Sequence, residues 1–568
     1  MRYSYLCILF FVLAYLLPAA GRPMLRPDEY RYAEIPYEMI ESGDFVVPRL
    51  LKARYFEKPV LGYWLVAVSF KCFGYSRFTL RLPMALASGA VALLLALWVR
   101  REKRDSELAA LAALLYLASG LAVALGISAV LDGILCLFTT ATIISCRMAV
   151  LTKRWDFERT LWLVLCGVSA GLGFLTKGLI AWAIPGTALL VWLLWEKRFK
   201  ALLWLPWIPL AALVVTVLPW ALAIHRADAD FWNYFIVVEH FQRFRDHADT
   251  QHAEPFWFYI PVLLGTIFPA ALAALPACGG GKAVWKTVWR DPLWRFALAA
   301  FLPPLVFLSA SSGKLATYIL PCFPFVALLM AIPTLRALRG NPRALSILKW
   351  VVTLLGWLLL VGGAGSVAFG AGLLPPVRLY RLLPELEGAW PFFIVIGIAG
   401  IADGILLIRA RRRQAKSQMK CFFSAVAVAL APIALLPDFG SSKMPERDLR
   451  ELVAAGDFDP RTAHIFTYGQ MGHSVAFLLK RPDTRLVTSS GEMKYGAERA
   501  RKEKEPPLLW TSREFSALLK RSDRPDVVYI TIFDRDIPPY ITAFPHRRLR
   551  RRELDLLVFP PAPARPKR

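Results

Sequence analysis

The chain has 568 residues, of which 57% are hydrophobic, and its 19 tryptophans and mean hydropathy of +0.46 are values that soluble globular proteins rarely reach. This composition predicts a polytopic membrane protein. The formal net charge of +26 does not indicate nucleic-acid binding, because the basic residues fall in short clusters between apolar runs. The eight cysteines contain no CxxC pair and most lie in or beside apolar runs, which is typical of small core residues rather than of a metal site or a disulfide framework.

Apolar runs long enough for membrane-spanning helices recur along the first three quarters of the chain. The first run ends in an LPAAG sequence that also fits a signal-peptidase site, but its long apolar core and the runs that follow favour an uncleaved span. Residues 1–436 are therefore predicted to form the transmembrane domain. The spans, about thirteen by the length criterion, are 3–20, 80–99, 108–125, 134–151, 161–175, 179–195, 202–224, 256–276, 293–310, 317–335, 350–373, 391–408 and 421–436.

Clusters of Lys and Arg predict the orientation of these spans. Each cluster follows an even-numbered span, and cytoplasmic loops are the ones that carry an excess of basic residues. The clusters lie at 100–104, 153–159, 196–200, 282–290, 336–343 and 409–420. With the N-terminus inside, all of them are cytoplasmic. The long loops 24–79 and 225–255 and everything after residue 436 are then external.

Residues 437–568 have the composition of a soluble α/β domain. Charged, helix-like segments such as REFSALLKR alternate there with β-rich apolar runs, which are AHIFTY, RLVTS, DVVYITIF and ELDLLVF. No group of residues in this domain is typical of a catalytic site.

The stretch from residue 28 to residue 64 packs seven acids and five bases directly behind an apolar segment. Under the predicted topology, ionisable residues from five separate parts of the sequence collect at the same external surface. Charges in or beside a membrane are expensive, so these residues are functional candidates. They are Asp28, Glu29, Glu57, Lys58, Asp132, Lys177, His240, Arg245, Lys314 and Tyr318.

Most of these candidates also have a purely structural interpretation. Asp28 and Glu29 fit a solvated loop start, and Lys58 fits a local charge pair with its neighbour. Lys177 and Lys314 fit lysines that snorkel at span ends. Tyr318 fits the interfacial aromatic belt, and His240 fits an ordinary loop or core histidine. Asp132 is the hardest to explain in this way. It interrupts an apolar run, and a carboxylate there needs a partner or a role.

The chemistry that would use such a set is transfer of a sugar from a polyprenyl phosphate. The departing phosphate gains negative charge and requires cations and hydrogen-bond donors, for which Lys58, Arg245 and Tyr318 are the right types. A carboxylate such as Asp28 or Asp132 would stabilise positive charge at the anomeric carbon, hold an amino or hydroxyl group, or act as a base toward an acceptor hydroxyl. An acceptor phosphate is already anionic at neutral pH and needs little help from a base.

Several segments occur in a characteristic order and spacing between the N-terminus and about residue 335: DEYRYAEIPYEMIESGDFVVP, YFEKPVLGYW, VLDGIL, LTKGLIA, LPWALAI, FWNYFIVVEHFQRF, EPFWFYIPV and GKLATYILPC. With these segments the chain resembles the aminoarabinose transferases that modify lipid A. That family lies within the GT-C group of polytopic glycosyltransferases with lipid-phosphate donors, which also contains the protein O-mannosyltransferases. The EKP and VEHFQRF elements are the most specific, whereas a DE pair in the first loop is shared across the broad group.

The resemblance implies roles for individual residues. Asp28 would be the principal catalytic-site carboxylate and Asp132 a second acid in the cavity. Lys58, Arg245 and Tyr318 would hold the undecaprenyl phosphate group.

The remaining candidates have less defined roles. Glu57 and His240 match positions where a divalent metal, zinc or magnesium, sits in this family, as a structural or adventitious site and not as a cofactor that catalysis requires. Glu29, Lys177 and Lys314 are additional candidates for the same site. The segment RDHADTQHAEPFW departs from the family pattern and leaves the acceptor less defined than the donor.

The resemblance thus implies a GT-C enzyme of the bacterial inner membrane, with its active site and C-terminal α/β domain on the periplasmic side. It would move 4-amino-4-deoxy-L-arabinose from undecaprenyl phosphate to a lipid A phosphate, which adds positive charge and gives resistance to cationic antimicrobial peptides. One alternative is transfer of another polyprenyl-linked sugar to lipopolysaccharide core, polysaccharide or protein. Another is a transporter of lipid-linked sugars, which is less favoured because charges near mid-bilayer and internal repeats are not evident.

Overall fold

The computed structural model describes residues 2–242, 253–373, 390–435, 446–469, 471–532, 537–552 and 554–561. The chain divides into two compact units, and each is described on its own. Unit 1 comprises residues 1–22, 58–62 and 73–437. Unit 2 comprises residues 23–57, 63–72 and 438–568. Most of the first predicted external loop therefore packs in the same unit as the C-terminal segment.

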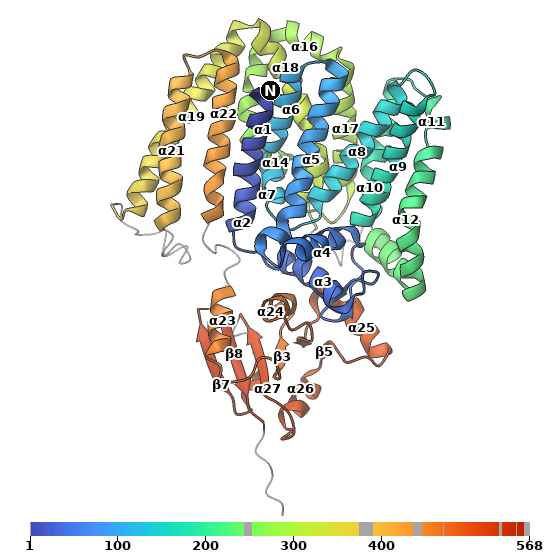
Figure 1. Cartoon of the computed structure of the whole chain (residues 1–568), viewed down its shortest axis with the longest axis vertical. Coiled ribbons are helices and arrows are strands. Elements are labelled where there is room, and N and C mark those ends of the chain that lie inside the picture. Colours follow the sequence, from blue (N-terminus) through green and yellow to red (C-terminus); the bar gives the residue numbers. More distant parts are fainter. Residues whose placement is uncertain are drawn as a thin grey trace, which may run out of the picture. The chain divides into compact units, whose positions relative to one another are not determined.

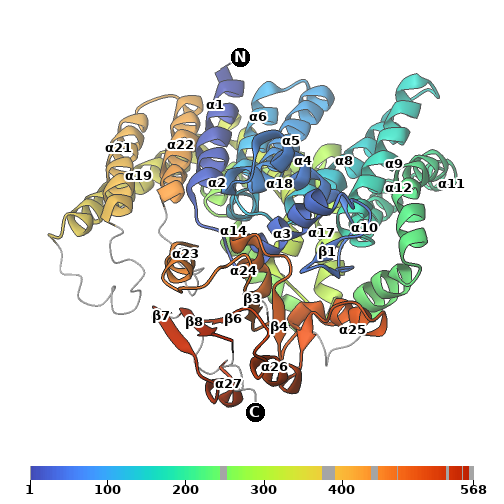
Figure 2. The same ribbon diagram turned by 60° about the horizontal axis from the view of Figure 1, so that its bottom comes forward.

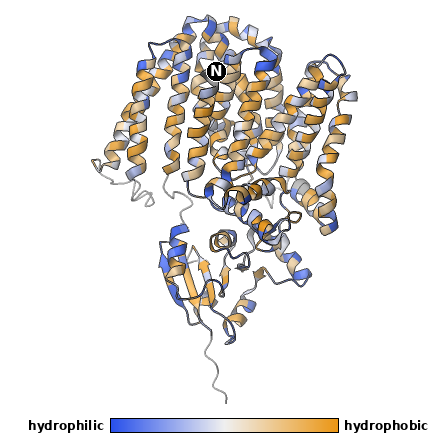
Figure 3. Cartoon of the chain, viewed as in Figure 1, coloured by the Kyte–Doolittle hydropathy of each residue, from blue (hydrophilic) through white to orange (hydrophobic). Residues whose placement is uncertain are grey.

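Unit 1 is a bundle of apolar helices. Within the described ranges, nine helical segments are long and apolar enough to cross a membrane. They are α5 (Arg77–Lys103), α8 (Asp132–Leu151), α9 (Phe157–Lys177), α11 with α12 (Ala201–Ala227), α17 (Pro292–Ala310), η5 with α18 (Ala316–Gly340), α19 (Pro342–Gly370), α21 (Trp390–Ala410) and α22 with η7 (Ala415–Leu435). Figure 3 shows that the bundle helices are hydrophobic along most of their length. The predicted class, a polytopic helical membrane protein, is confirmed.

Four further predicted spans coincide with apolar helices of 10–17 residues, which are shorter than the roughly 20 residues that cross a bilayer. They are α1, η1 and α2 together (Tyr5–Gly21), α6 (Ser106–Leu117), α10 (Ile180–Trp195), and η3 with α14 (Phe256–Thr266). The total of thirteen spans therefore stays a prediction. The other described elements of unit 1 are α7 (Gly120–Gly126), η2 (Asn233–Gln242), α15 (Ala270–Ala274), η4 (Leu275–Gly280) and α16 (Gly281–Trp289).

The break between α6 and α7 has a local cause. Gly120 donates its backbone N–H to Phe268 O at 2.9 Å, and a Cβ atom on Gly120 would lie 2.9 Å from the same oxygen. Only glycine allows so close an approach of two backbones. The apolar run that was predicted as one span, 108–125, is therefore divided into two helices.

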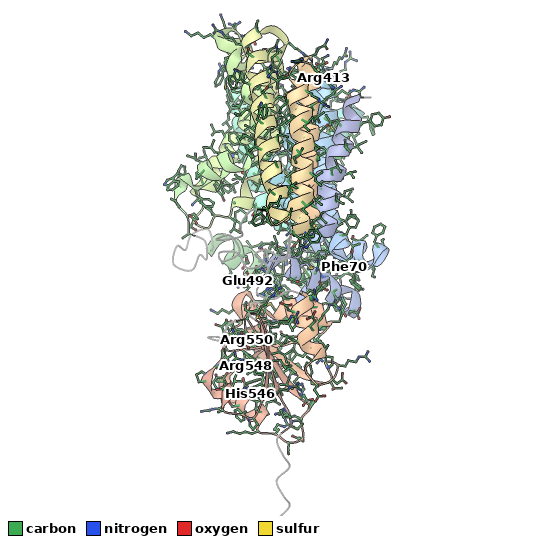
Figure 4. The ribbon with its side chains drawn as sticks, turned by 90° about the vertical axis from the view of Figure 1, so that its left-hand side faces the viewer. Phe70, Arg413, Glu492, His546, Arg548 and Arg550 are labelled. Carbon is green, nitrogen blue, oxygen red and sulfur yellow. The ribbon has the colours of Figure 1, made fainter. Side chains whose placement is uncertain are left out.

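Ion pairs link the loops that carry the basic clusters. The pairs between these loops and the adjoining helix ends include Arg101–Glu158, Lys103–Asp291, Arg295–Glu196, Arg336–Asp291, Arg339–Asp105, Arg339–Glu107 and Lys416–Glu107. They bring all six predicted basic clusters to one end of the bundle, which is at the top of Figure 1 together with the N-terminus. Arg413, which Figure 4 labels, lies at this end as well. We call this end of unit 1 the basic end.

Unit 2 contains a six-stranded mixed sheet with the strand order β5-β4-β3-β6-β8-β7 (Figure 2). Its strands are β3 (His464–Thr467), β4 (Arg485–Val487), β5 (Leu509–Trp510), β6 (Val527–Thr531), β7 (Arg547–Arg551) and β8 (Leu554–Phe559). Strands β5, β4, β3 and β6 are parallel, and β8 and β7 are antiparallel additions. Every residue of β6 and β8 is buried, as expected for strands covered on both faces. The four predicted β-rich runs each contain one of these strands.

Helices flank this sheet, and a charged edge strand ends it. The helices are α23 (Glu446–Ala454), α24 (Met471–Leu479), η8 (Gly491–Met493), α25 (Lys494–Lys502), α26 (Ser512–Leu519) and α27 (Pro539–Thr542). The helix predicted from REFSALLKR is α26, which begins with a capping box between Thr511 and Glu514. Figure 4 labels Arg548 and Arg550 on the edge strand β7, where positive charge discourages pairing with other chains.

The first charged loop is a folded part of unit 2. Helix α3 (Asp28–Ser42) has two acids in its first turn, which the helix dipole favours, and it ends at Gly43 with φ +73°. Tyr30 and Tyr37 of α3 pack edge-on against Phe477 of α24, with ring centroids 6.3 and 6.5 Å apart. The short strands β1 (Arg49–Leu50) and β2 (Ala53–Arg54) and the helix α4 (Leu61–Phe73) follow.

Candidate active site

Asp132 and Lys177 form a buried ion pair between two helix ends. Asp132 is the first residue of α8 and Lys177 is the last residue of α9, and Lys177 Nζ lies 2.7 Å from Asp132 Oδ1. The side chains are only 7% and 13% exposed. An acid at a helix N-terminus and a base at a helix C-terminus both interact favourably with the helix dipole. Since α8 ends and α9 begins next to the cluster at 153–159, the pair lies at the end of the bundle opposite the basic end.

Tyr318 joins this pair from a distant part of the chain. It lies on the 3-10 helix η5 (Ala316–Cys322), and the ring centroid of Tyr318 is 4.5 Å from Lys177 Nζ. At this distance the ammonium group is attracted by the face of the ring. The structure therefore brings together three of the predicted site residues, Asp132, Lys177 and Tyr318.

Lys58 lies close to a carboxylate that the sequence analysis did not single out. Lys58 Nζ is 3.9 Å from Glu239 Oε2, and the Glu239 side chain is only 3% exposed. Glu239 Oε1 accepts a hydrogen bond of 3.2 Å from the Tyr234 hydroxyl. Four residues after Lys58, Gly62 packs so closely on Leu131 that a Cβ atom would lie 2.2 Å from its side chain. This packing ties the Lys58 segment to the residue that precedes Asp132.

Lys314 has a structural explanation. It is 4% exposed, and its ammonium group donates to Glu254 O at 2.7 Å. The same residues line a surface cavity of about 400 Å³ that also includes Phe256, Ser309 and Ser312. The contact to a backbone carbonyl satisfies this buried charge and holds the chain around Glu254 against the start of η5.

In unit 2, the two acids that open α3 differ in their surroundings. Glu29 is 1% exposed, and its carboxylate accepts a hydrogen bond of 2.6 Å from Leu25 N, so it stabilises the entry to the helix. The Asp28 side chain is 50% exposed and forms an ion pair with Arg31, one turn further along α3. Of the two, Asp28 is the one that a bound ligand can reach.

Arg31 links Asp28 to the C-terminal part of the chain. Its guanidinium also forms an ion pair with Glu492 of η8 and donates to the Tyr55 hydroxyl at 3.2 Å. Burial alone would lower the pKa of Arg31, but Tyr55, Tyr32, Glu492 and Asp28 together raise it well above its ordinary value. Arg31 is thus a permanent cation between two acids. Glu492 is labelled in Figure 4.

Sequence reasoning missed Arg31, Glu492 and Glu239. Arg31 and Glu492 are 461 residues apart in the chain, and nothing in the composition of the C-terminal segment distinguishes Glu492 from other surface acids. Glu239 did carry a signal, because it lies in the VEHFQRF element next to His240. In that element only His240 was predicted as a site residue, because the family resemblance implies a metal ligand there.

Three predicted residues remain to be placed. Glu57 is buried, with 7% of its surface exposed. The side chain of His240 and all of Arg245 lie outside the described residues. Among the residues that are described, no group of three or more His, Cys, Asp or Glu side chains could hold a metal ion. A buried carboxylate and an imidazole are suitable ligands for zinc. Because the side chain of His240 lies outside the described residues, the metal site at Glu57 and His240 stays a prediction.

The described side chains at this end of unit 1 suit an anionic ligand with a developing charge. They include two ammonium groups and a phenol, and a carboxylate lies beside each ammonium group. In unit 2, a half-exposed carboxylate is held at a helix N-terminus by a guanidinium. Fixed charges of this kind stabilise charge that develops during a reaction.

Comparison with protein families identifies the broad group. The family model described as dolichyl-phosphate-mannose-protein mannosyltransferase matches residues 1–235. This part of the chain contains Asp28, Lys58, Asp132 and Lys177. The predicted relation to the protein O-mannosyltransferases is confirmed.

Curated relatives match most of the chain. The undecaprenyl phosphate-alpha-4-amino-4-deoxy-L-arabinose arabinosyl transferase of Serratia proteamaculans is 35% identical over 503 residues, which are 87% of this chain and 87% of the relative. The enzyme of the same name from Pectobacterium atrosepticum is 37% identical over 510 residues, 88% of this chain and 87% of the relative. Alignments of this length extend well beyond residue 335, where the recognisable sequence segments ended.

A solved structure has the same fold. The crystal structure of ArnT from Cupriavidus metallidurans bound to undecaprenyl phosphate is 22% identical, covers 100% of this chain and 99% of that chain, and superposes with a TM-score of 0.78. The fold of this chain, including the helical bundle and the C-terminal sheet, is therefore that of ArnT. Because a curated relative is 35% identical over 87% of this chain, the chain belongs to the family of undecaprenyl phosphate-4-amino-4-deoxy-L-arabinose arabinosyl transferases.

Proposed function

We propose that this enzyme transfers 4-amino-4-deoxy-L-arabinose from undecaprenyl phosphate to a phosphate group of lipid A. The observation that carries the proposal is the sequence identity of 35% over 503 residues to a relative whose name states this sugar and this carrier lipid. The charged side chains described above support it, because they suit a reaction between two phosphate-bearing lipids.

The proposed reaction exchanges one phosphate for another at the anomeric carbon. An oxygen of the acceptor phosphate forms a bond to this carbon while the bond to the donor phosphate breaks. The donor changes from a diester with one negative charge to a monoester with about two at neutral pH, and the acceptor changes in the opposite sense. Charge is balanced overall, and no general base is needed.

Individual residues have proposed roles in this exchange. Lys58, Arg245 and Tyr318 bind the donor phosphate, where negative charge grows. Asp28 and Asp132 face the sugar, where a carboxylate stabilises positive charge at the anomeric carbon or holds the amino group. The ion pairs of Asp28 with Arg31 and of Asp132 with Lys177 support these roles, because they fix the position of both carboxylates.

We further propose that the enzyme lies in the inner membrane of a Gram-negative bacterium, with unit 2 in the periplasm. The gathering of all six basic clusters at one end of unit 1 supports a cytoplasmic location for that end. Transfer to the lipid A phosphate is then proposed to take place at the opposite, periplasmic end. No metal is proposed to take part in the reaction.

Mass spectrometry of lipid A tests this proposal. Cells that lack the gene are compared with cells that express the wild-type chain, Asp28→Asn or Glu41→Gln. Glu41 is the matched control because it is an exposed acid on the same helix. We expect an aminoarabinose increment with wild type and Glu41→Gln, and none with Asp28→Asn. Unchanged lipid A together with a modified lipopolysaccharide core or protein would overturn the acceptor assignment.

A further inference from the structure

Glu239 has a buried side chain beside Lys58, the cation proposed to bind the donor phosphate. Its side chain is 3% exposed, whereas that of Lys58 is 21% exposed. At a separation of 3.9 Å, which is longer than a hydrogen bond, the carboxylate offsets the charge of Lys58. The Tyr234 hydroxyl, 3.2 Å from the other carboxylate oxygen, fixes the orientation of the group.

The proposed reaction changes the charge of the ligand at Lys58. The donor enters with one negative charge on its phosphodiester, and the lipid product carries about two on its phosphate monoester. A strongly cationic pocket would therefore hold the product more tightly than the donor. An enzyme that turns over must release this product, and a fixed negative charge near Lys58 weakens the retention of a dianion more than that of a monoanion.

On this basis we propose that Glu239 is a positioning and charge-balancing residue that holds Lys58 in place and limits how tightly the site retains the polyprenyl phosphate product. The proposal rests on the proposed function for the direction of the charge change. Glu239 does not take part in bond making. It acts through Lys58, and its effect scales with the charge of the ligand.

This scaling gives a quantitative signature. Because a Coulomb energy is proportional to the ligand charge, removing the charge of Glu239 changes the logarithm of the affinity twice as much for a dianion as for a monoanion. For a carboxylate several ångströms from the phosphate in a partly buried site, we expect about tenfold tighter binding of the monoester and about threefold tighter binding of the diester. A purely structural role of Glu239 would weaken both.

The experiment measures the binding of two lipids to the full-length protein in nanodiscs. The probes are undecaprenyl phosphate and its methyl phosphodiester, which share one tail and differ by one charge. Glu239→Gln is expected to raise the preference for the monoester over the diester about threefold relative to wild type. Tyr234→Phe is the matched control, since it removes the hydrogen bond but keeps the charge, and its preference is expected to equal that of wild type.

The outcomes separate this inference from the proposed function. An unchanged preference in Glu239→Gln, weaker binding of both lipids, or no binding of either lipid to wild type overturns the inference. A raised preference in an enzyme that transfers no aminoarabinose supports the inference and overturns the proposed function instead. If Glu239→Gln is not recovered as folded protein, Glu239→Asp is used, because its shorter side chain draws the charge back from Lys58. A preference in that variant equal to that of wild type also overturns the inference.

Discussion

Replacing Lys177 with methionine would remove the cation that faces Asp132 while keeping a side chain of similar length. The carboxylate of Asp132, which is 7% exposed, would then be buried without the ammonium group that now lies 2.7 Å away. Breaking a buried pair by removing one partner costs about 3–5 kcal/mol. Since both side chains keep a little exposure, we expect Lys177→Met to lower the free energy of unfolding by about 2–3 kcal/mol.

The double variant Asp132→Asn with Lys177→Met isolates the ion pair from the other contacts. Removing both charges leaves no unpaired ion, so most of the lost stability should return. About 0.5–1 kcal/mol should stay lost, because Lys177 no longer lies over the ring of Tyr318. The single variant Asp132→Asn leaves the ammonium group of Lys177 unpaired and should likewise cost about 2–3 kcal/mol. The expected coupling energy between the two positions is therefore about 3–5 kcal/mol. Both variants are expected to lack transfer activity, so stability and activity separate in this series.

The free energy of unfolding of wild type, the two single variants and the double variant is measured in detergent micelles by circular dichroism. The pair Arg101–Glu158, with side chains 53% and 45% exposed, is the matched control. Exposed pairs contribute between zero and about 1 kcal/mol, so the cycle for Arg101→Met and Glu158→Gln should show little coupling. A coupling below about 0.5 kcal/mol for Asp132 and Lys177 would refute the reasoning, since the pair would then behave like a solvated one.

Two further predictions concern unit 2. Glu34 is fully buried one turn from Glu38, and neither of its carboxylate oxygens has a hydrogen-bond partner among the described residues. Burial raises the pKa of Glu34 well above its ordinary value and that of Glu38 to about 7, so the folded state binds more protons and stability falls as pH rises from about 4.5 through 7. Glu34→Gln should therefore be more stable than wild type above pH 7, by about 1–3 kcal/mol, and equally stable near pH 4. Thermal unfolding at several pH values measures this difference. A difference that is the same at all pH values would contradict the prediction. Arg31→Lys should lower kcat at least about tenfold without a loss of folded protein. The reason is that a lysine cannot bridge Asp28, Glu492 and Tyr55 as a guanidinium does. An unchanged kcat in a transfer assay would show that the reaction does not need this bridge.

The sequence was sufficient for those features that depend on composition and local pattern. The helical bundle followed from apolar runs, and the strands of the C-terminal sheet followed from short β-rich runs. Asp132 and Lys177 were predicted at the external ends of neighbouring spans, and their contact follows once α8 and α9 are antiparallel neighbours. Helix α4 was not predicted as a separate element, because its 13 residues are too few for a span and lie within a charged stretch.

The parts that could not be predicted depend on contacts between distant segments. The ion pair of Arg31 with Glu492 crosses 461 residues, and no periodicity or motif connects the two. The role of Glu29 was also hidden. In the sequence it is the second half of an acid pair, whereas in the structure its carboxylate accepts from Leu25 N and only Asp28 stays half-exposed. One of two adjacent acids is thus committed to the fold.

The chain as a whole carries a formal charge of +26, but three of the described cations, two in unit 1 and one in unit 2, each face a carboxylate. Lys177 faces Asp132, Lys58 faces Glu239, and Arg31 faces both Asp28 and Glu492. The excess positive charge is instead concentrated in the clusters at the basic end, where it fixes topology. Such charge-matched pairs suit the proposed exchange of one phosphate for another, because strongly cationic surroundings would retain the dianionic lipid product. The local neutrality of these pairs, rather than the high net charge, is therefore the electrostatic property that suits turnover.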